Sequence, residues 1–141
     1  VLALVVLSTI TLASASTSHE LVDAKTFQDS VLGSTQPVFI DFFSPRCGSC
    51  QDFAPVYEAM KAHFPTAVFL GCDIDDAGME LANLLGVLET TGVPAVRAFA
   101  HGGRGEGERI WDGVDPPTEK ELRRLIQASL DRNPRGPSPA S

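Results

Sequence analysis

The sequence predicts one α/β domain in which a mixed central β-sheet is flanked by helices. The chain has 141 residues, the size of a single domain that can bury its own core. Segments with the patterns of strands and helices alternate over residues 20–131 without an internal repeat. One of them, Val38–Phe43, is too rich in β-branched and aromatic residues for an edge strand, so we place it in the middle of a sheet covered on both faces.

Two helices are expected around this central strand. The first covers Asp23–Leu32, with Asp23 as the candidate N-cap and Gly33 at its end. The second covers Cys50–Phe64, where apolar residues recur at helical spacing, and it should bend at Pro55. The segment between the central strand and the second helix is therefore a strand-to-helix junction.

The second half of the domain is expected to complete the sheet. Strands are predicted over Ala67–Ile74 and Ala95–Ala100, with a short helix over Gly78–Leu85 between them. The glycine-rich segment His101–Gly107 should be a turn or loop, and Glu108–Trp111 the returning strand of a hairpin.

A final helix is expected over Thr118–Leu130. Thr118 and Glu121 have the spacing of a capping box, and the apolar stripe of this helix is expected to pack on the core. The proline-rich residues 132–141 that follow are expected to form a disordered tail.

The N-terminal segment has the pattern of a signal peptide. Residues 1–13 are almost wholly apolar but fall short of the ~20 residues that span a bilayer, and Ala13-Ser14-Ala15 matches a cleavage site. We expect a signal peptide at 1–15 that is cleaved after Ala15. We expect it to be N-terminally incomplete, because neither Met nor a basic region precedes the apolar run. The alternatives are a transmembrane anchor and an organelle transit peptide. Cleavage would place the mature protein in the secretory pathway, in the endoplasmic reticulum lumen or secreted.

The chain is acidic, with 11 Lys and Arg residues, 18 Asp and Glu residues and a formal net charge of -7. This charge disfavours the phosphate backbone of nucleic acids and anionic membranes. We therefore expect no nucleic-acid partner, and no membrane association after signal cleavage.

The segment Cys47-Gly48-Ser49-Cys50 is the candidate reactive centre on the chemistry of its residues alone. The two cysteines can close a small disulfide ring at the expected start of a helix. Backbone N–H groups at a helix N-terminus stabilise an anion, so the pKa of Cys47 should lie below the usual value of about 8.5. Arg46 should act in the same direction, unless it is only a solvated surface charge. Cys47 is thus the candidate nucleophile and Cys50 the candidate resolving thiol.

Zinc binding is the competing interpretation, because C-x-x-C is also half of a zinc site. The other soft ligands in the sequence are Cys72, His19, His63 and His101, and none forms a second pair at zinc-like spacing. We therefore expect no metal.

Several segments together resemble a known family. Phe39–Cys50 resembles the active-site segment of thioredoxins and protein disulfide isomerase domains, and Phe53–Glu58 resembles the helix that follows it in disulfide isomerase domains. Gly92–Val96 resembles the cis-proline loop of the family, and Gly113 matches a glycine after the fifth strand. The resemblance covers roughly Glu20 to Leu130 and implies a thioredoxin fold that exchanges disulfides.

The resemblance also implies roles for residues outside the C-x-x-C segment. Asp41 corresponds to a buried acid that carries the proton of the resolving cysteine, although an acid at a strand end can also simply reach solvent. Burial would raise the pKa of Asp41 and suit it to proton transfer near neutral pH. Pro94 would follow a cis peptide bond and lie against the two cysteines, and the Val93 backbone would bind an extended substrate strand.

The sequence departs from the family pattern around the reactive centre. Phe43 and Arg46 stand where thioredoxins usually carry Trp, and Ser49 stands where thioredoxins have Pro and disulfide isomerases have His. Gly71 lies near the place of the lysine that thioredoxins pair with the buried acid. We expect Arg46, Gly48 and Ser49 to tune the redox potential.

Three functions remain open at this point. The first is an oxidase or isomerase of disulfides in secretory proteins, favoured by the signal peptide; the second is a thioredoxin-like protein disulfide reductase. The third is a polypeptide-binding module that uses the groove at Pro94. The expected partners are client proteins with thiols or disulfides and a redox recycling partner, and no metal, nucleotide or flavin cofactor is implied. Cys72 is expected to be a buried, inert thiol and Trp111 a packing residue.

Overall fold

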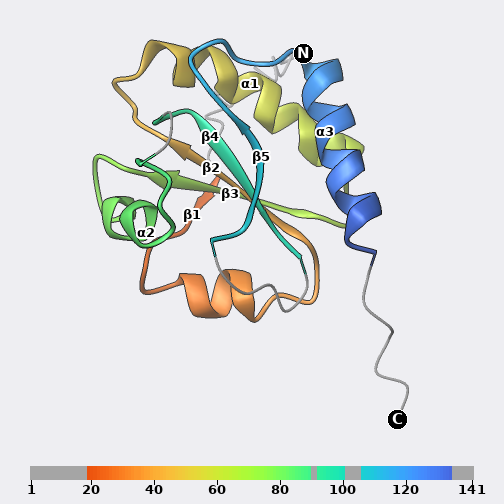
Figure 1. Cartoon of the computed structure of the whole chain (residues 1–141), viewed down its shortest axis with the longest axis horizontal. Helices are drawn as coiled ribbons and strands as arrows, with labels where there is room; N and C mark the ends of the chain where they lie inside the picture. Colours follow the sequence, from red (N-terminus) through yellow and green to blue (C-terminus); the bar gives the residue numbers. More distant parts are fainter. Residues whose placement is uncertain (1–18, 90–91, 101–105, 135–141) are drawn as a thin grey trace, which may run out of the picture.

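The sheet has five strands and is mixed, as expected. The computed structural model describes residues 19–89, 92–100 and 106–134. The strand order is β1-β3-β2-β4-β5 (Figure 1). The strands are β1 Glu20–Leu21, β2 Val38–Phe43, β3 Val68–Asp73, β4 Ala95–Phe99 and β5 Glu108–Asp112. Strands β1, β3 and β2 are parallel, whereas β4 is antiparallel to both β2 and β5. The central position predicted for Val38–Phe43 is confirmed, since β2 pairs on both sides.

Helices cover both faces of this sheet (Figure 1). They are the π-helix η1 Gln28–Leu32 and the α-helices α1 Gly48–His63, α2 Gly78–Leu84 and α3 Glu119–Arg132. One core cluster lies under η1 and α2 and includes Ile40, Phe42 and Cys72. The other lies under α1 and α3 and includes Phe39 and Tyr57. Because alternate residues of a strand face opposite sides, Asp41 shares the α1 face with Phe39.

The first helical segment differs from the expected helix over Asp23–Leu32. Only Gln28–Leu32 is assigned, and it is a π-helix in which the Gly33 N–H binds the Gln28 carbonyl at 2.8 Å. The Asp23 carboxylate accepts hydrogen bonds from the N–H groups of Lys25 and Thr26, both at 2.9 Å. Asp23 therefore caps a local turn as an N-cap would, but the turn passes into a wider helix instead of a regular α-helix.

The C-terminal elements follow the prediction closely. β4 and β5 form the expected hairpin, although residues 101–105 of its loop lie outside the described residues. Thr118 caps α3 with both hydrogen bonds of a capping box to Glu121. α3 continues to Arg132, two residues beyond Leu130, and the rest of the expected tail from residue 135 lies outside the described residues, as does the predicted signal peptide.

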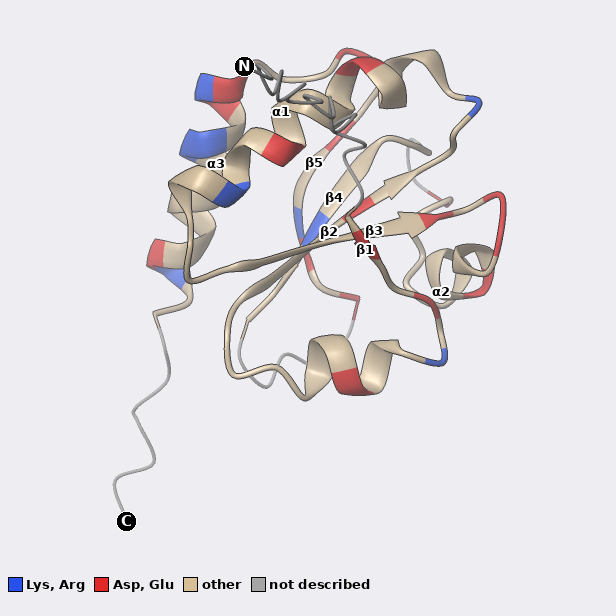
Figure 2. Ribbon diagram, turned by 180° about the vertical axis from the view of Figure 1, so that it is seen from behind, with Lys and Arg blue, Asp and Glu red and all other residues tan. Residues whose placement is uncertain are grey.

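Charges on the described surface are mixed, with acidic residues on the segment between β3 and α2 and both signs on α3 (Figure 2). Within the described ranges, no helix combines the length and apolar character that a membrane crossing requires.

Candidate active site

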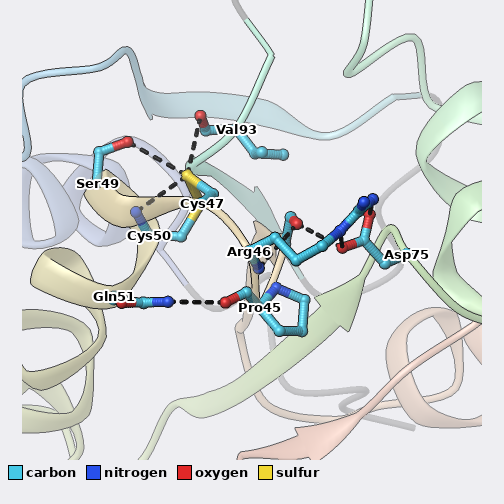
Figure 3. Close-up of a disulfide and its surroundings, with 9 residues drawn as sticks. Pro45, Arg46, Cys47, Ser49, Cys50, Gln51, Asp75 and Val93 are labelled. Carbon is cyan, nitrogen blue, oxygen red and sulfur yellow. Dashed lines mark hydrogen bonds and ion pairs between the residues drawn. A yellow bond between two sulfur atoms is a disulfide. The ribbon is translucent and has the colours of Figure 1, made fainter.

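Cys47 and Cys50 form a disulfide where β2 passes into α1 (Figure 3). Their Cα atoms are 5.2 Å apart. Helix α1 begins at Gly48, two residues earlier than the sequence predicts, because Cys47 itself is the N-cap. Cys47 is partly exposed, whereas Cys50 is only 3% exposed. An incoming disulfide can therefore reach the first sulfur but not the second.

The Cys47 sulfur is surrounded by hydrogen-bond donors. The Cys50 N–H donates to it at 3.1 Å, and the Ser49 hydroxyl, which can donate, lies 3.3 Å away (Figure 3). No acidic residue occupies the first turn of α1. Hydrogen-bond donors at a helix N-terminus are the kind of environment that favours a thiolate over a thiol, so the low pKa expected for reduced Cys47 remains a prediction.

Gly48 is the exposed first residue of the helix. A Cβ built at this position would meet nothing within 4 Å, so no steric contact requires a glycine here. Its predicted influence on the redox potential remains a prediction.

The segment before β4 lies against the reactive sulfur. The Val93-Pro94 peptide bond is cis, and the Val93 carbonyl oxygen is 3.9 Å from Cys47 Sγ (Figure 3). The Gly113 N–H donates to the Pro94 carbonyl at 3.4 Å, which ties the segment to the end of β5. The fold thus brings Val93, Pro94 and Cys47 together although 46 positions separate Val93 from Cys47.

Arg46 is bound to an acid and not to the sulfur (Figure 3). Its Nε and Nη2 donate to the two carboxylate oxygens of Asp75 at 2.9 and 3.0 Å. Ser44 Oγ also donates to Asp75, and these contacts lower the pKa of Asp75 to about 2. Because the Asp75 charge offsets that of the guanidinium, Arg46 should have little electrostatic effect on Cys47.

Replacing Arg46 with glutamine should accordingly change the pKa of Cys47 by less than ~0.5 units. The measurement is the pH dependence of iodoacetamide alkylation in the reduced protein. Asp75→Asn is the matched variant, because it leaves the Arg46 charge unbalanced and should lower the pKa of Cys47. A large rise of the Cys47 pKa in Arg46→Gln would show that the arginine acts on the sulfur despite its ion pair.

Asp41 is buried behind the disulfide. The residue is 3% exposed, and burial raises the pKa of its carboxyl to about 8. Among the described residues, none forms a hydrogen bond with its Oδ1 atom. Asp41 and Cys50 line the same cavity of about 180 Å³, so the acid and the buried cysteine face a common space.

Sequence reasoning missed His19, which lines this cavity too. Its side chain is 8% exposed and reaches the cavity because Gly71, paired with Asp41 across β2 and β3, has no side chain. The only signal in the sequence was the glycine near the usual place of a lysine. Nothing in the spacing of residues connects position 19 to position 41.

Cys72 lies in the core, and the partly buried Trp111 packs against the core, as expected. Cys72 is a free, fully buried thiol whose Sγ–H donates to the Gly78 carbonyl at 3.4 Å. Burial, followed by nearby acids, raises its pKa to about 12, so it is unreactive near neutral pH. The Trp111 ring packs on Phe53 with centroids 5.5 Å apart.

Among the described residues, no group of three or more His, Cys, Asp or Glu side chains is placed to hold a metal ion.

The fold and this site define the class of protein. A mixed sheet, a disulfide at the N-terminus of α1 and a cis-proline beside it make up a thioredoxin-fold thiol–disulfide oxidoreductase domain. A family model described as Thioredoxin matches residues 18–127, and the chain belongs to this family.

Curated relatives divide between two kinds of protein. The chain is 35% identical over 116 residues to protein disulfide-isomerase tigA of Aspergillus niger, covering 80% of this chain and 30% of that protein. It is 31% identical over 102 residues to a probable protein disulfide-isomerase A6 of Medicago sativa, covering 70% and 27%. It is also 35% identical over 88 residues to a mitochondrial thioredoxin of Rattus norvegicus, covering 62% and 51%. The chain thus spans less than a third of the disulfide isomerases named here.

Proposed function

We propose that this domain exchanges disulfides with client proteins in the secretory pathway, as an oxidase or isomerase, through Cys47-Gly48-Ser49-Cys50. The observation that carries the proposal is the partly exposed sulfur of Cys47, which has hydrogen-bond donors around it and is joined to the buried sulfur of Cys50. The similarity to a disulfide isomerase over 80% of the chain favours the oxidase or isomerase over a reductase, and so does the signal peptide expected at residues 1–15. The clients carry thiols or disulfides, and a separate redox partner recycles the domain.

The mechanism follows from the placement of the two sulfurs. In the oxidising direction, a client thiolate attacks Cys47 Sγ, the Cys47–Cys50 bond breaks, and Cys50 leaves as a thiolate that takes a proton from Asp41. A second client thiol then attacks the mixed disulfide and leaves Cys47 as a thiolate. The client loses two electrons and the domain gains them. The helix N-terminus and the Ser49 hydroxyl stabilise the Cys47 thiolate and so favour the reduced domain.

The client strand would bind beside Val93 and Pro94. The backbone of this segment faces the reactive sulfur at 3.9 Å, so an extended client segment that pairs with it would hold its own sulfur next to Cys47.

A thioredoxin-like reductase is the second candidate, favoured by the similarity to the mitochondrial thioredoxin. The reduction potential of the Cys47/Cys50 couple separates the two, because direction depends on this potential against that of the compartment. We expect equilibration with glutathione to give a value nearer the roughly -180 mV of disulfide isomerase than the roughly -270 mV of thioredoxin.

Ser49→Ala is the matched variant for this measurement. It removes a hydrogen bond to the Cys47 thiolate, which should make the couple more reducing by about 30 mV, the equivalent of about 1.4 kcal/mol. A wild-type potential near that of thioredoxin would rule out the oxidase and support the reductase.

A further inference from the structure

The cavity behind the disulfide is lined by a histidine, His19, that the disulfide exchange described above does not use. This cavity of about 180 Å³ lies between β2 and the start of α1. It is lined by His19, Asp41, Phe43, Ser44, Pro45, Cys50, Gln51 and Ala54. A water molecule needs about 10 to 15 Å³ and polar partners, so the cavity can hold water. Three of its lining side chains can exchange protons: those of Cys50, Asp41 and His19.

The sheet register places His19 in this cavity. β1 pairs with β3 so that Leu21 is opposite Gly71, and β3 pairs with β2 so that Gly71 is opposite Asp41. A Cβ at Gly71 would lie 3.1 Å from the Phe43 ring, 3.3 Å from a methyl group of Leu21 and 3.4 Å from the His19 Cβ. Any larger residue at position 71 would therefore crowd both Phe43 and His19, which line the cavity.

The surroundings of His19 favour a neutral ring that can accept a proton. From α1, the Tyr57 ring packs edge-on at 4.8 Å, Glu58 Oε2 lies 3.2 Å from Nε2, and Lys61 binds Glu58. Burial and then the Lys61 charge lower the pKa of His19, while Glu58 opposes them. On the side of β2, the His19 ring faces the cavity that Asp41 also lines. Neither nitrogen of the His19 ring forms a hydrogen bond with the described residues.

We propose that His19 passes protons between Asp41 and solvent, through water in this cavity, whenever Cys50 gains or loses its own proton. The inference rests on the proposed function. When the reduced domain attacks a disulfide, Asp41, which is mostly protonated near neutral pH, first passes its proton by way of water to His19, which releases it to solvent. The Asp41 carboxylate then takes the proton of Cys50, and the Cys50 thiolate attacks Cys47 Sγ of the mixed disulfide. The Cys47–Cys50 bond forms, and the bond to the client breaks with release of a thiolate. Because His19 acts through Asp41, it is a positioning residue and not a catalytic residue.

The test separates the two chemical steps of one turnover. Reduced protein reacts with dithiobis(nitrobenzoate) in a stopped-flow instrument, where Cys47 releases the first nitrothiolate and Cys50 the second. His19→Ala should leave the first phase unchanged, slow the second about tenfold near neutral pH, and alter its pH dependence. Added imidazole, small enough for the space left by the side chain, should restore the second phase.

His63→Gln is the matched control. His63 lies on α1 with its ring nitrogen 3.0 Å from Glu119 and does not line the cavity, so both phases and the imidazole response should match the wild type. An unchanged second phase in His19→Ala would overturn the proposal, and so would slowing of both phases or a loss that imidazole does not restore. A wild type without any second phase would instead contradict the proposed function.

Discussion

Replacing Cys47 with serine will reduce thiol–disulfide exchange to the rate of the uncatalysed reaction. Among the described cysteines only Cys47 is partly exposed, and its hydroxyl analogue cannot form a mixed disulfide. Insulin reduction and refolding of scrambled ribonuclease are the two measurements. Both should fall to background, because the same sulfur acts in either direction of exchange.

Cys50→Ser should behave differently from Cys47→Ser. The attack of Cys47 remains possible, but no second sulfur can release the client, so mixed disulfides with client proteins should accumulate and be visible on a non-reducing gel. Cys72→Ser is the matched control, since a buried thiol with a pKa of about 12 takes no part in exchange. Its activity should equal that of the wild type.

The same variants also test the alternative that the domain is a polypeptide-binding module. If Cys47→Ser still binds extended polypeptides while the wild-type protein shows no exchange in either assay, the domain is a polypeptide-binding module and the enzyme proposal is wrong. Loss of exchange with retained binding would instead assign the chemistry to Cys47 and show that polypeptide binding does not need its sulfur.

Most of the fold could be predicted from local patterns. The apolar run of Val38–Phe43, the hairpin at β4 and β5 and the capping box at Thr118 are short-range signals, and each is present in the structure. The first helix was less predictable. Asp23 caps the turn before this segment, but the N-cap of the helix itself is Phe27 and not Asp23. The sequence does not reveal that the backbone widens to a π-helix, because more than one carbonyl group can accept the hydrogen bond of the Gly33 N–H.

The candidate site likewise has features that the sequence predicts and features that it does not. Cys47 and Cys50 are neighbours in the chain, so their spacing alone predicted the disulfide. The ion pair between Arg46 and Asp75 joins residues 29 positions apart, and the cavity shared by His19 and Asp41 depends on the register of three strands. Such contacts depend on the sheet as a whole, which explains why the ion pair of Arg46 and the position of His19 were not predicted.

Replacing Asp41 with asparagine should slow the release of the second nitrothiolate about a hundredfold, because Cys50 then lacks its proton acceptor. The first phase, which depends on Cys47, should change little. Asp29→Asn, on the exposed side of η1, is the matched control and should alter neither phase. Equal second phases in the wild type and Asp41→Asn would remove the acid from the mechanism.

The same substitution should change how stability depends on pH. Asp41 has a folded-state pKa of about 8, above its usual 3.8, so between these values the folded protein binds more protons than the unfolded chain. Stability is then greatest below the unfolded pKa and is lost as pH rises toward the folded pKa. The loss is about 1.4 kcal/mol for each pH unit, or about 4 kcal/mol between pH 4 and 7.

Denaturant unfolding of the oxidised protein at several pH values measures how its free energy of unfolding changes with pH. Relative to Asp41→Asn, which cannot titrate, the wild type should lose stability steadily from about pH 4 and level off above about pH 8. Parallel curves for the two proteins would mean that Asp41 ionises in the folded state as it does in water. A carboxyl that ionises so easily would bind a proton too weakly to take it from the Cys50 thiol, or to return it, at the pH where the exchange reaction runs.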